Sequence, residues 1–147
     1  MAPNSDTFDN QILNLVNNER AKVGVDPLRI NEQLDRAADL HSQDQADMNR
    51  MTHDGSNGSS MGSRISDSGY NWSNVAENVS QVALDPDTVM YGGTGFENIG
   101  ITGWMDSPGH RNNILDPNLE EIGVGYSTSA DGSPYWTQTF GNSSDAA

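Results

Sequence analysis

The stretch GWMDSPGHRNNIL, residues 103–115, combines a tryptophan, a structure-breaking Ser-Pro-Gly turn, a histidine and a short apolar ending. We expect the segment 96–106 to be partly helical and to anchor Trp104 in the core. The turn at 107–109 ends or kinks that helix, because proline removes a backbone donor. His110 follows directly. A titratable side chain therefore lies between a turn and the apolar residues that are expected to pack against the core.

Upstream of this stretch, apolar residues recur at helical spacing in two segments. The segment 6–23 carries them on one face and stops at Gly24. Asn31 is expected to cap a second helix over 32–50. The inner, apolar face of that helix includes His41, which we interpret as a buried histidine that hydrogen-bonds within the fold.

The rest of the chain has the composition of loops and short strands. Gly, Ser, Asn and Asp dominate 52–74, which predicts a long loop. A short apolar-polar segment at 75–84 leads to a turn-rich excursion at 85–95. Alternation predicts two strands, 121–127 and 134–141, and the Asp-Gly pair between them predicts a hairpin turn.

Helices first and a hairpin last favour an α+β fold or a layered α-β-α arrangement. The chain has 147 residues, which suits one domain with one core. We assign that domain to 10–141 and expect flexible segments at 1–9 and 142–147.

Composition restricts the partners. The 21 acidic and 7 basic residues give a formal net charge of -14, which repels phosphate backbones, so we expect no nucleic-acid partner. Cysteine is absent, which excludes disulfides and a thiolate nucleophile. No apolar run approaches the ~20 residues of a transmembrane helix. The polar start is not a signal peptide, so an exported protein would already have lost its signal.

Six short motifs occur in order along the chain and point to one family. They are ILNLVNNERAKVGVDPLRINEQLDRAADLHSQDQADMN from residue 12, THDG at 52–55, AEN at 76–78, the stretch at 103–115, EIGVGYS and YWTQTFG. In this combination the sequence resembles the bacterial, cysteine-free branch of the CAP superfamily, the SCP-like extracellular proteins. Relatives of that branch include cysteine-rich secretory proteins, insect-venom antigens and plant pathogenesis-related proteins.

The resemblance implies a three-layer α-β-α sandwich in which an antiparallel sheet lies between helical layers. It also implies a central cleft that carries His53, Glu77 and His110. Many family members have an acidic residue three positions after the tryptophan of the GW segment. Ser107 stands at that position here, with Asp106 beside it.

Two neutral imidazoles and a carboxylate suit Zn²⁺ or another divalent cation, with water as a further ligand. The resemblance therefore implies a metal site of His53, Glu77 and His110. A nucleophilic Ser107 paired with His110 is less favoured, because we interpret Ser107 as the C-terminal residue of a helix. Five residues are expected to support the cleft through hydrogen bonds or charge: Asn78, Asp106, Ser107, Arg111 and Gln138.

These residues lead to three hypotheses for function. The first is a secreted, monomeric module whose cleft binds a divalent cation and a small extracellular ligand such as a lipid, glycan or peptide. The second is a metal-dependent hydrolase, a peptidase or nuclease, in which Glu77 is the candidate base. The third is a structural or adhesive module with a vestigial cleft. A shared fold does not decide among them.

Overall fold

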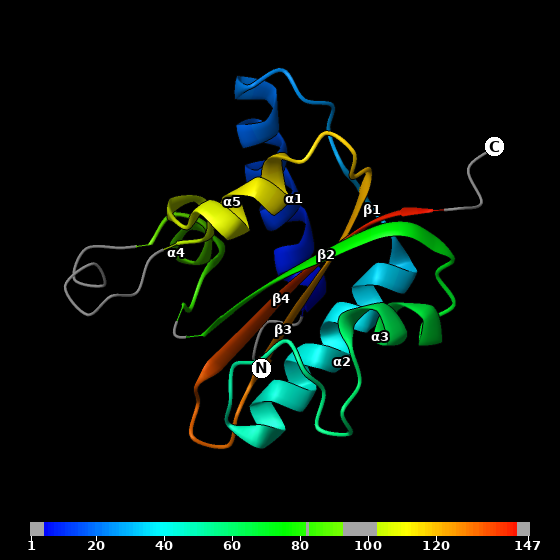
Figure 1. The fold of residues 1–147 in the computed structure, drawn as a ribbon. Helices are drawn as coiled ribbons and strands as arrows, with labels where there is room; N and C mark the ends of the chain where they lie inside the picture. Colours follow the sequence, from blue (N-terminus) through cyan, green and yellow to red (C-terminus); the bar gives the residue numbers. More distant parts are fainter. Residues whose placement is uncertain (1–4, 82, 93–102, 144–147) are drawn as a thin grey trace.

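The computed structural model describes residues 5–81, 83–92 and 103–143 (Figure 1). In chain order the elements are α1 (Ser5–Lys22), β1 (Arg29–Ile30), α2 (Glu32–Met48), α3 (Met61–Asp67), β2 (Trp72–Gln81), α4 (Pro86–Tyr91), the short 3₁₀ helix η2 (Trp104–Asp106), α5 (Pro108–Leu115), β3 (Glu121–Thr128) and β4 (Pro134–Ser143). The two long predicted helices and the two predicted strands are confirmed. Helix α1 and strand β4 extend beyond the assigned 10–141 boundaries.

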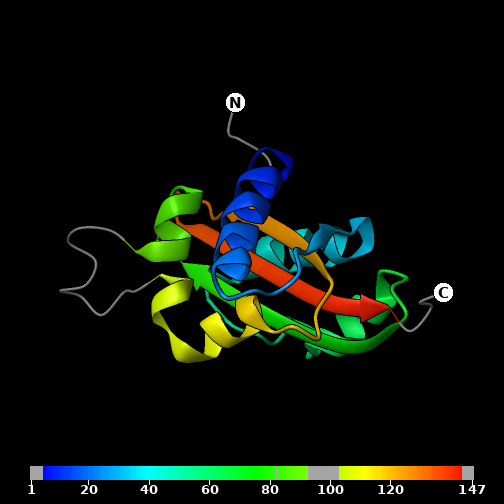
Figure 2. The same ribbon diagram turned by 90° about the horizontal axis from the view of Figure 1, so that it is seen from above.

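The sheet has the strand order β1-β3-β4-β2. Strands β3 and β4 form the predicted antiparallel hairpin, and Gly132 at its turn has a φ of 88°. Strand β2 pairs antiparallel with β4, whereas the two-residue β1 joins β3 in parallel at the other edge. Helices α1, α4 and α5 lie on one side of this sheet, and α2 and α3 lie on the other (Figures 1 and 2). The α+β fold with a sheet between two helical layers is therefore confirmed.

The apolar core fills the space between the sheet and α1. Alternate residues of β3 and β4 point into it, which is the period of two that strands impose. Phe8 and Tyr126 meet edge-on, and Trp136 lies against both rings with centroids 5.1 and 4.6 Å away. The fully buried apolar side chains on this side include Ile12, Val16, Met90, Ile114, Ile122, Val124, Trp136 and Phe140.

Helix α2 packs on the opposite face of the sheet, where its backbone lies close to the backbone of β3. Gly123 and Gly125 of β3 face it, and a Cβ at Gly125 would lie 2.2 Å from the carbonyl oxygen of Ala38. At Gly123 an added Cβ would lie 2.2 Å from backbone atoms of α2. The two glycines of EIGVGYS therefore set the distance between α2 and the sheet.

Three expectations were wrong. The region 52–74 is not a continuous loop, because it contains α3 and the start of β2. Within the predicted excursion at 85–95, Asp85 caps α4 and Pro86 occupies its first turn. The turn at 107–109 does not end a long helix in the described part of the chain, because η2 has three residues and α5 begins at Pro108.

The helix start at Pro108 has a simple physical reason. Proline is favoured at the first position of a helix, where its missing N–H has no intrahelical acceptor to lose. Ser107 is thus the residue at which η2 ends and α5 begins, and His110 lies inside the first turn of α5. The predicted helical segment at 96–102 lies outside the described residues, as do 1–4, 82, 93–95 and 144–147.

Candidate functional site

Glu77 of β2 lies at the centre of a cluster of titratable side chains. It is only 7% exposed, and its two carboxylate oxygens accept hydrogen bonds from Arg64 Nη2 at 3.0 and 2.8 Å. His53 Nδ1 donates to Glu77 Oε1 at 3.0 Å, and His41 Nε2 lies 3.8 Å from the same oxygen. The structure therefore brings two of the three predicted metal ligands, His53 and Glu77, into direct contact.

The position of His53 depends on α2. The backbone N–H of Thr52 donates to Gln45 Oε1 at 3.1 Å, and the carbonyl of Thr52 accepts a hydrogen bond from His41 Nε2 at 2.7 Å. Both α2 side chains are fully buried, so they hold the chain firmly just before His53. The interpretation of His41 as a buried, hydrogen-bonding histidine is correct. Sequence reasoning missed that it reaches the Glu77 cluster.

Arg64 is a further residue of the cluster that the sequence pattern does not indicate, because the composition of 52–74 predicts a loop. It projects from α3, and its Nη1 donates to the carbonyl of Ser59 at 3.1 Å. A capping box formed by Ser60 and Ser63 begins α3. The spacing of Met61 and Ile65 on one face of this short helix was a further signal that could have indicated it.

His110 is positioned by a network of amides. Asn78 Nδ2 donates to the carbonyl of His110 at 3.1 Å and to Gln138 Oε1 at 2.9 Å. Asn113, one turn further along α5, donates to Asn78 Oδ1 at 2.9 Å. These contacts fix α5 against β2 and β4, and Asn113 is a further residue that the motif comparison did not single out.

The two helical layers meet at the outer edge of the sheet. Strand β2 is the last strand in the order, so side chains from both sides can reach around it. There the structure has a hollow of about 350 Å³, lined by His53, Met61, Val75, Ala76, Glu77 and Asn113. His53 follows α2 and Asn113 belongs to α5, so residues from both helical layers line the hollow. We call this hollow the β2 cleft.

The three histidines have different proton affinities. The hydrogen bond from His53 to the Glu77 carboxylate raises the pKa of His53, and this outweighs its partial burial. Burial lowers the pKa of His110, and the nearby His53 imidazole lowers it further. Burial also lowers the pKa of His41, against the opposing attraction of Glu77. The described residues that line the β2 cleft include His53 but not His110.

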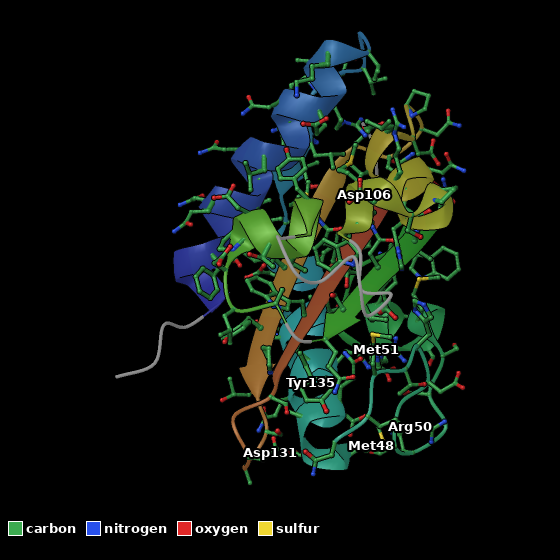
Figure 3. The ribbon with its side chains drawn as sticks, turned by 90° about the vertical axis from the view of Figure 1, so that its left-hand side faces the viewer. Met48, Arg50, Met51, Asp106, Asp131 and Tyr135 are labelled. Carbon is green, nitrogen blue, oxygen red and sulfur yellow. The ribbon has the colours of Figure 1, made fainter. Side chains whose placement is uncertain are left out.

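Asp106 and Arg111 lie elsewhere. Together with Met105, Pro108, Asn112 and Leu115 they line a separate hollow of about 360 Å³ along α5. Figure 3 shows Asp106 beside α5, away from Arg50 and Met51, which precede His53 in the chain. The hydrogen bonds of Asn78 thus link Gln138 and the carbonyl of His110 in α5. Asp106 and Arg111 do not belong to the described lining of the β2 cleft.

The arrangement limits how a metal ion could bind. Among the described residues, no group of three or more His, Cys, Asp and Glu side chains is arranged to hold one. Glu77 already accepts two hydrogen bonds from Arg64 and one from His53, so three of the roughly four acceptor positions of its carboxylate are filled before any cation binds. His53 remains suited to the role: its Nδ1–H donates to a carboxylate, which leaves Nε2 as a lone-pair donor. The predicted cation site of His53, Glu77 and His110 therefore stays a prediction.

Comparison with known proteins agrees with the fold and the motifs. The model of the cysteine-rich secretory protein family, CAP, matches residues 13–140. The chain is 34% identical over 140 residues to the uncharacterized protein YkwD of Bacillus subtilis, covering 95% of this chain and 49% of YkwD. It is 26% identical over 134 residues to the uncharacterized membrane protein YlbC of the same organism, covering 91% of this chain and 34% of YlbC. This chain belongs to the CAP family and spans half or less of these two relatives.

Solved structures show the same fold. An extracellular, SCP-domain protein of Bacillus anthracis superposes with a TM-score of 0.74 at 25% identity, covering 94% of this chain and 41% of that one. An outer surface protein of Borrelia burgdorferi has a TM-score of 0.76 at 20% identity, covering 97% and 99% of the two chains. These neighbours are extracellular or outer-surface proteins. In the described part of this chain, none of the helices has the length and apolar character needed to span a membrane.

Proposed function

We propose that this CAP domain is an extracellular binding module that takes a small ligand in the β2 cleft. The observation that carries the proposal is the pairing of His53 with the buried Glu77. A buried carboxylate that accepts the Nδ1–H of a histidine fixes its ring and tautomer, while 56% of the His53 side chain stays exposed. The cleft thus combines a positioned polar group with the apolar side chains of Met61 and Val75.

We further propose that a divalent cation such as Zn²⁺ binds through His53 and His110, with Glu77 as a supporting residue. When bound, the cation would supply a positive centre that polarises an oxygen atom of the ligand. Glu77 orients the His53 ring by accepting its Nδ1–H, and Arg64 donates a hydrogen bond to the other oxygen of the Glu77 carboxylate. Because protons compete for the imidazole lone pairs, binding should strengthen as pH rises through the raised pKa of His53.

A hydrolytic role for Glu77 has less support. A general base must take up a proton on a free lone pair, and three of the roughly four lone-pair positions of Glu77 already accept hydrogen bonds from Arg64 and His53. Secretion rests on the extracellular and outer-surface neighbours. Detection of the protein in the medium of its source cells, with a cytoplasmic marker retained in the cells, would test that part.

Calorimetric titration with ZnCl₂ tests the binding site. His53→Ala and His110→Ala should each weaken binding by about 10-fold or more, because each removes a donor, whereas Glu77→Gln should weaken it less than either. Asn112→Ala, an exposed change on the same helix as His110, is the matched control and should leave the heats unchanged. Equal heats for the wild type and the two histidine variants would refute the cation site.

A further inference from the structure

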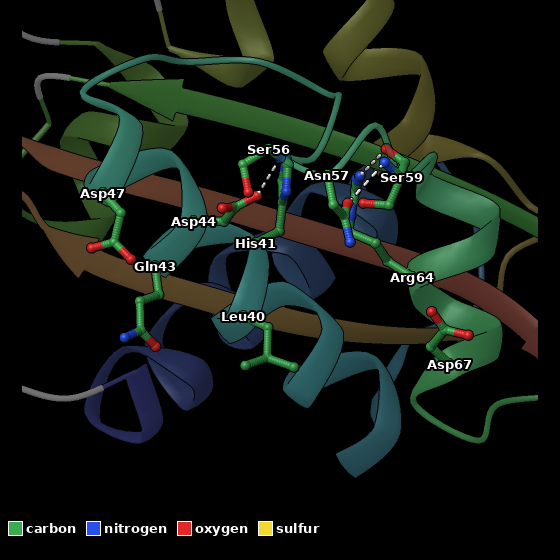
Figure 4. A pocket seen from close by; sticks show the side chains of 10 residues that line it. All are labelled: Leu40, His41, Gln43, Asp44, Asp47, Ser56, Asn57, Ser59, Arg64 and Asp67. Carbon is green, nitrogen blue, oxygen red and sulfur yellow. Dashed lines mark hydrogen bonds between the residues drawn. The ribbon is translucent and has the colours of Figure 1, made fainter.

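A second pocket lies behind Glu77, on the α2–α3 side of the sheet. It has a volume of about 320 Å³ and is bordered by α2, α3 and the chain between them (Figure 4). Arg64 and His41 line this pocket, while the Glu77 carboxylate that contacts them lines the β2 cleft. We call it the α2–α3 pocket, and it is separate from the binding site proposed above.

The lining of this pocket is strongly acidic. Asp44 and Asp47 of α2 and Asp67 of α3 contribute three carboxylates, against one guanidinium, Arg64, whose charge is already paired with Glu77. Asp44 accepts a hydrogen bond from the backbone N–H of Ser56 at 2.8 Å. In the described residues no hydrogen bond or ion pair engages the side chains of Asp47 and Asp67. The pocket is therefore rich in acceptors and poor in donors.

His41 supplies an independent sign of a ligand. The ring is 1% exposed and lines the pocket, and its Nε2–H donates to the carbonyl of Thr52. Its other nitrogen, Nδ1, is buried and has no hydrogen-bond partner among the described residues. Because Nε2 carries the proton that bonds to Thr52, the neutral ring has its lone pair on Nδ1. A buried acceptor without a donor costs free energy, so a ligand that brings an N–H there is favoured.

We propose that the α2–α3 pocket binds the primary ammonium group of a small polar ligand. The ammonium has three donors for acceptors such as the His41 Nδ1 lone pair and the Asp44 carboxylate, and its positive charge offsets one of the three carboxylate charges. The exposed Leu40 at the rim offers apolar contact to the carbon atoms of the ligand. The overall net charge of -14 raises the local concentration of such cations. An amino sugar and the side chain of a peptide lysine both carry this chemistry.

Long-range ¹H–¹⁵N NMR of the histidine rings tests the proposal on the full chain. Titration with D-glucosamine, or with Nα-acetyl-lysine methylamide, should move the His41 Nδ1 resonance in a saturable way, and the tighter of the two probes identifies the source. D-glucose and N-acetyl-D-glucosamine, which have the same ring without the ammonium, should leave it in place. Binding should weaken as salt rises, because the attraction is electrostatic.

Two matched double variants sharpen the result. Asp47→Asn/Asp67→Asn removes two carboxylates from the pocket and should weaken amine binding by about 10-fold. Asp87→Asn/Glu120→Gln removes the same net charge from exposed positions elsewhere and should bind within about twofold of the wild type. The proposal is overturned if neither amine moves the His41 Nδ1 resonance, if the neutral sugars move it equally, or if both double variants lose binding alike.

Discussion

The two faces of the sheet are joined to their helices by different kinds of contact. On the α1 side, large apolar side chains such as Trp136 and Phe140 fill the interface. On the α2 side, glycines let the helix approach the strand backbone, and the buried Thr137 hydroxyl bonds with Ser42 and Gln45 at 2.8 and 3.2 Å. The apolar face supplies burial energy, which is not directional, whereas the polar face supplies directional contacts.

This difference bears on how the residues around Glu77 are held. A site needs side chains held in one orientation, and hydrogen bonds and close backbone contact provide that better than apolar packing does. His41, His53 and Arg64 all come from the α2–α3 side, and Glu77 faces them from β2. Four changes test whether the two faces behave as differently as their contacts indicate.

The largest effect should come from Gly125→Val. The added Cβ would overlap the carbonyl oxygen of Ala38, so α2 must move away from β3, and we expect a loss of more than about 3 kcal/mol in the free energy of unfolding. Gly109→Ala is the control, since a Cβ there has no neighbour within 4 Å, and alanine should be neutral or stabilise α5 by up to about 1 kcal/mol. Urea denaturation measures both. Similar small effects would show that α2 is not packed as tightly as described.

Arg64→Met should come next. It leaves the buried Glu77 without its cationic partner, and we expect a loss of about 3 kcal/mol. The double variant Arg64→Met/Glu77→Gln should recover much of that loss, because it removes the buried charge as well. Lys22→Met breaks the exposed ion pair with Glu19 on α1 and should cost no more than about 1 kcal/mol. If the double variant were no more stable than Arg64→Met alone, the unpaired charge of the buried Glu77 would not be the cause of the loss.

A reciprocal pair of changes compares the two faces directly. Thr137→Val removes the hydroxyl to which Ser42 and Gln45 bond and should cost about 1–3 kcal/mol. Val124→Thr places a hydroxyl in the apolar core and should cost about 1–3 kcal/mol for the opposite reason. Val23→Thr, on the exposed end of the chain after α1, should change stability by less than about 0.5 kcal/mol. If Thr137→Val were stabilising, apolar packing would contribute more than the Thr137 hydrogen bonds to the stability of the interface between α2 and the sheet.

The smallest effect concerns pH. Burial lowers the pKa of His41, so protonation opposes folding, and its effect is a loss of stability as pH falls below the unfolded value of about 6.5. Glu77, Arg64 and Asp44 are the charged groups that act on this ring. The pKa of His53 is raised, so its stabilising effect is complete below about pH 6.5 and is lost as pH rises through the folded pKa.

Denaturation from pH 5 to 8 separates the two histidines. His41→Gln should flatten the decline of stability on the acid side, because the glutamine does not titrate. His53→Asn should make that decline steeper, because it removes a group that favours folding when protonated. The same pH slope in the wild type and both variants would show that neither ring is coupled to folding.

Several parts of the fold and the site could be predicted from local pattern. Helical spacing identified α1 and α2, and alternation with an Asp-Gly turn identified the β3–β4 hairpin. The order of short motifs indicated the family, and the family resemblance implied that His53 and Glu77 share a cleft. Strand β2 escaped notice because it lies at an edge and begins with exposed polar residues, so it shows little hydrophobic alternation.

The sequence by itself therefore determined the family, the layers and the residue types of the site, because periodicity, turn residues and motif order act over short stretches of chain. Only the tertiary structure decided which of those residues meet. It placed Arg64 on Glu77 across 13 residues, brought His41 to Thr52, and set Asp106 and Arg111 along another hollow. Such contacts depend on how the helices pack on the sheet, above all on the close approach of α2 that Gly123 and Gly125 permit. This packing distance depends on residues that are far apart in the sequence, so no local pattern predicts it.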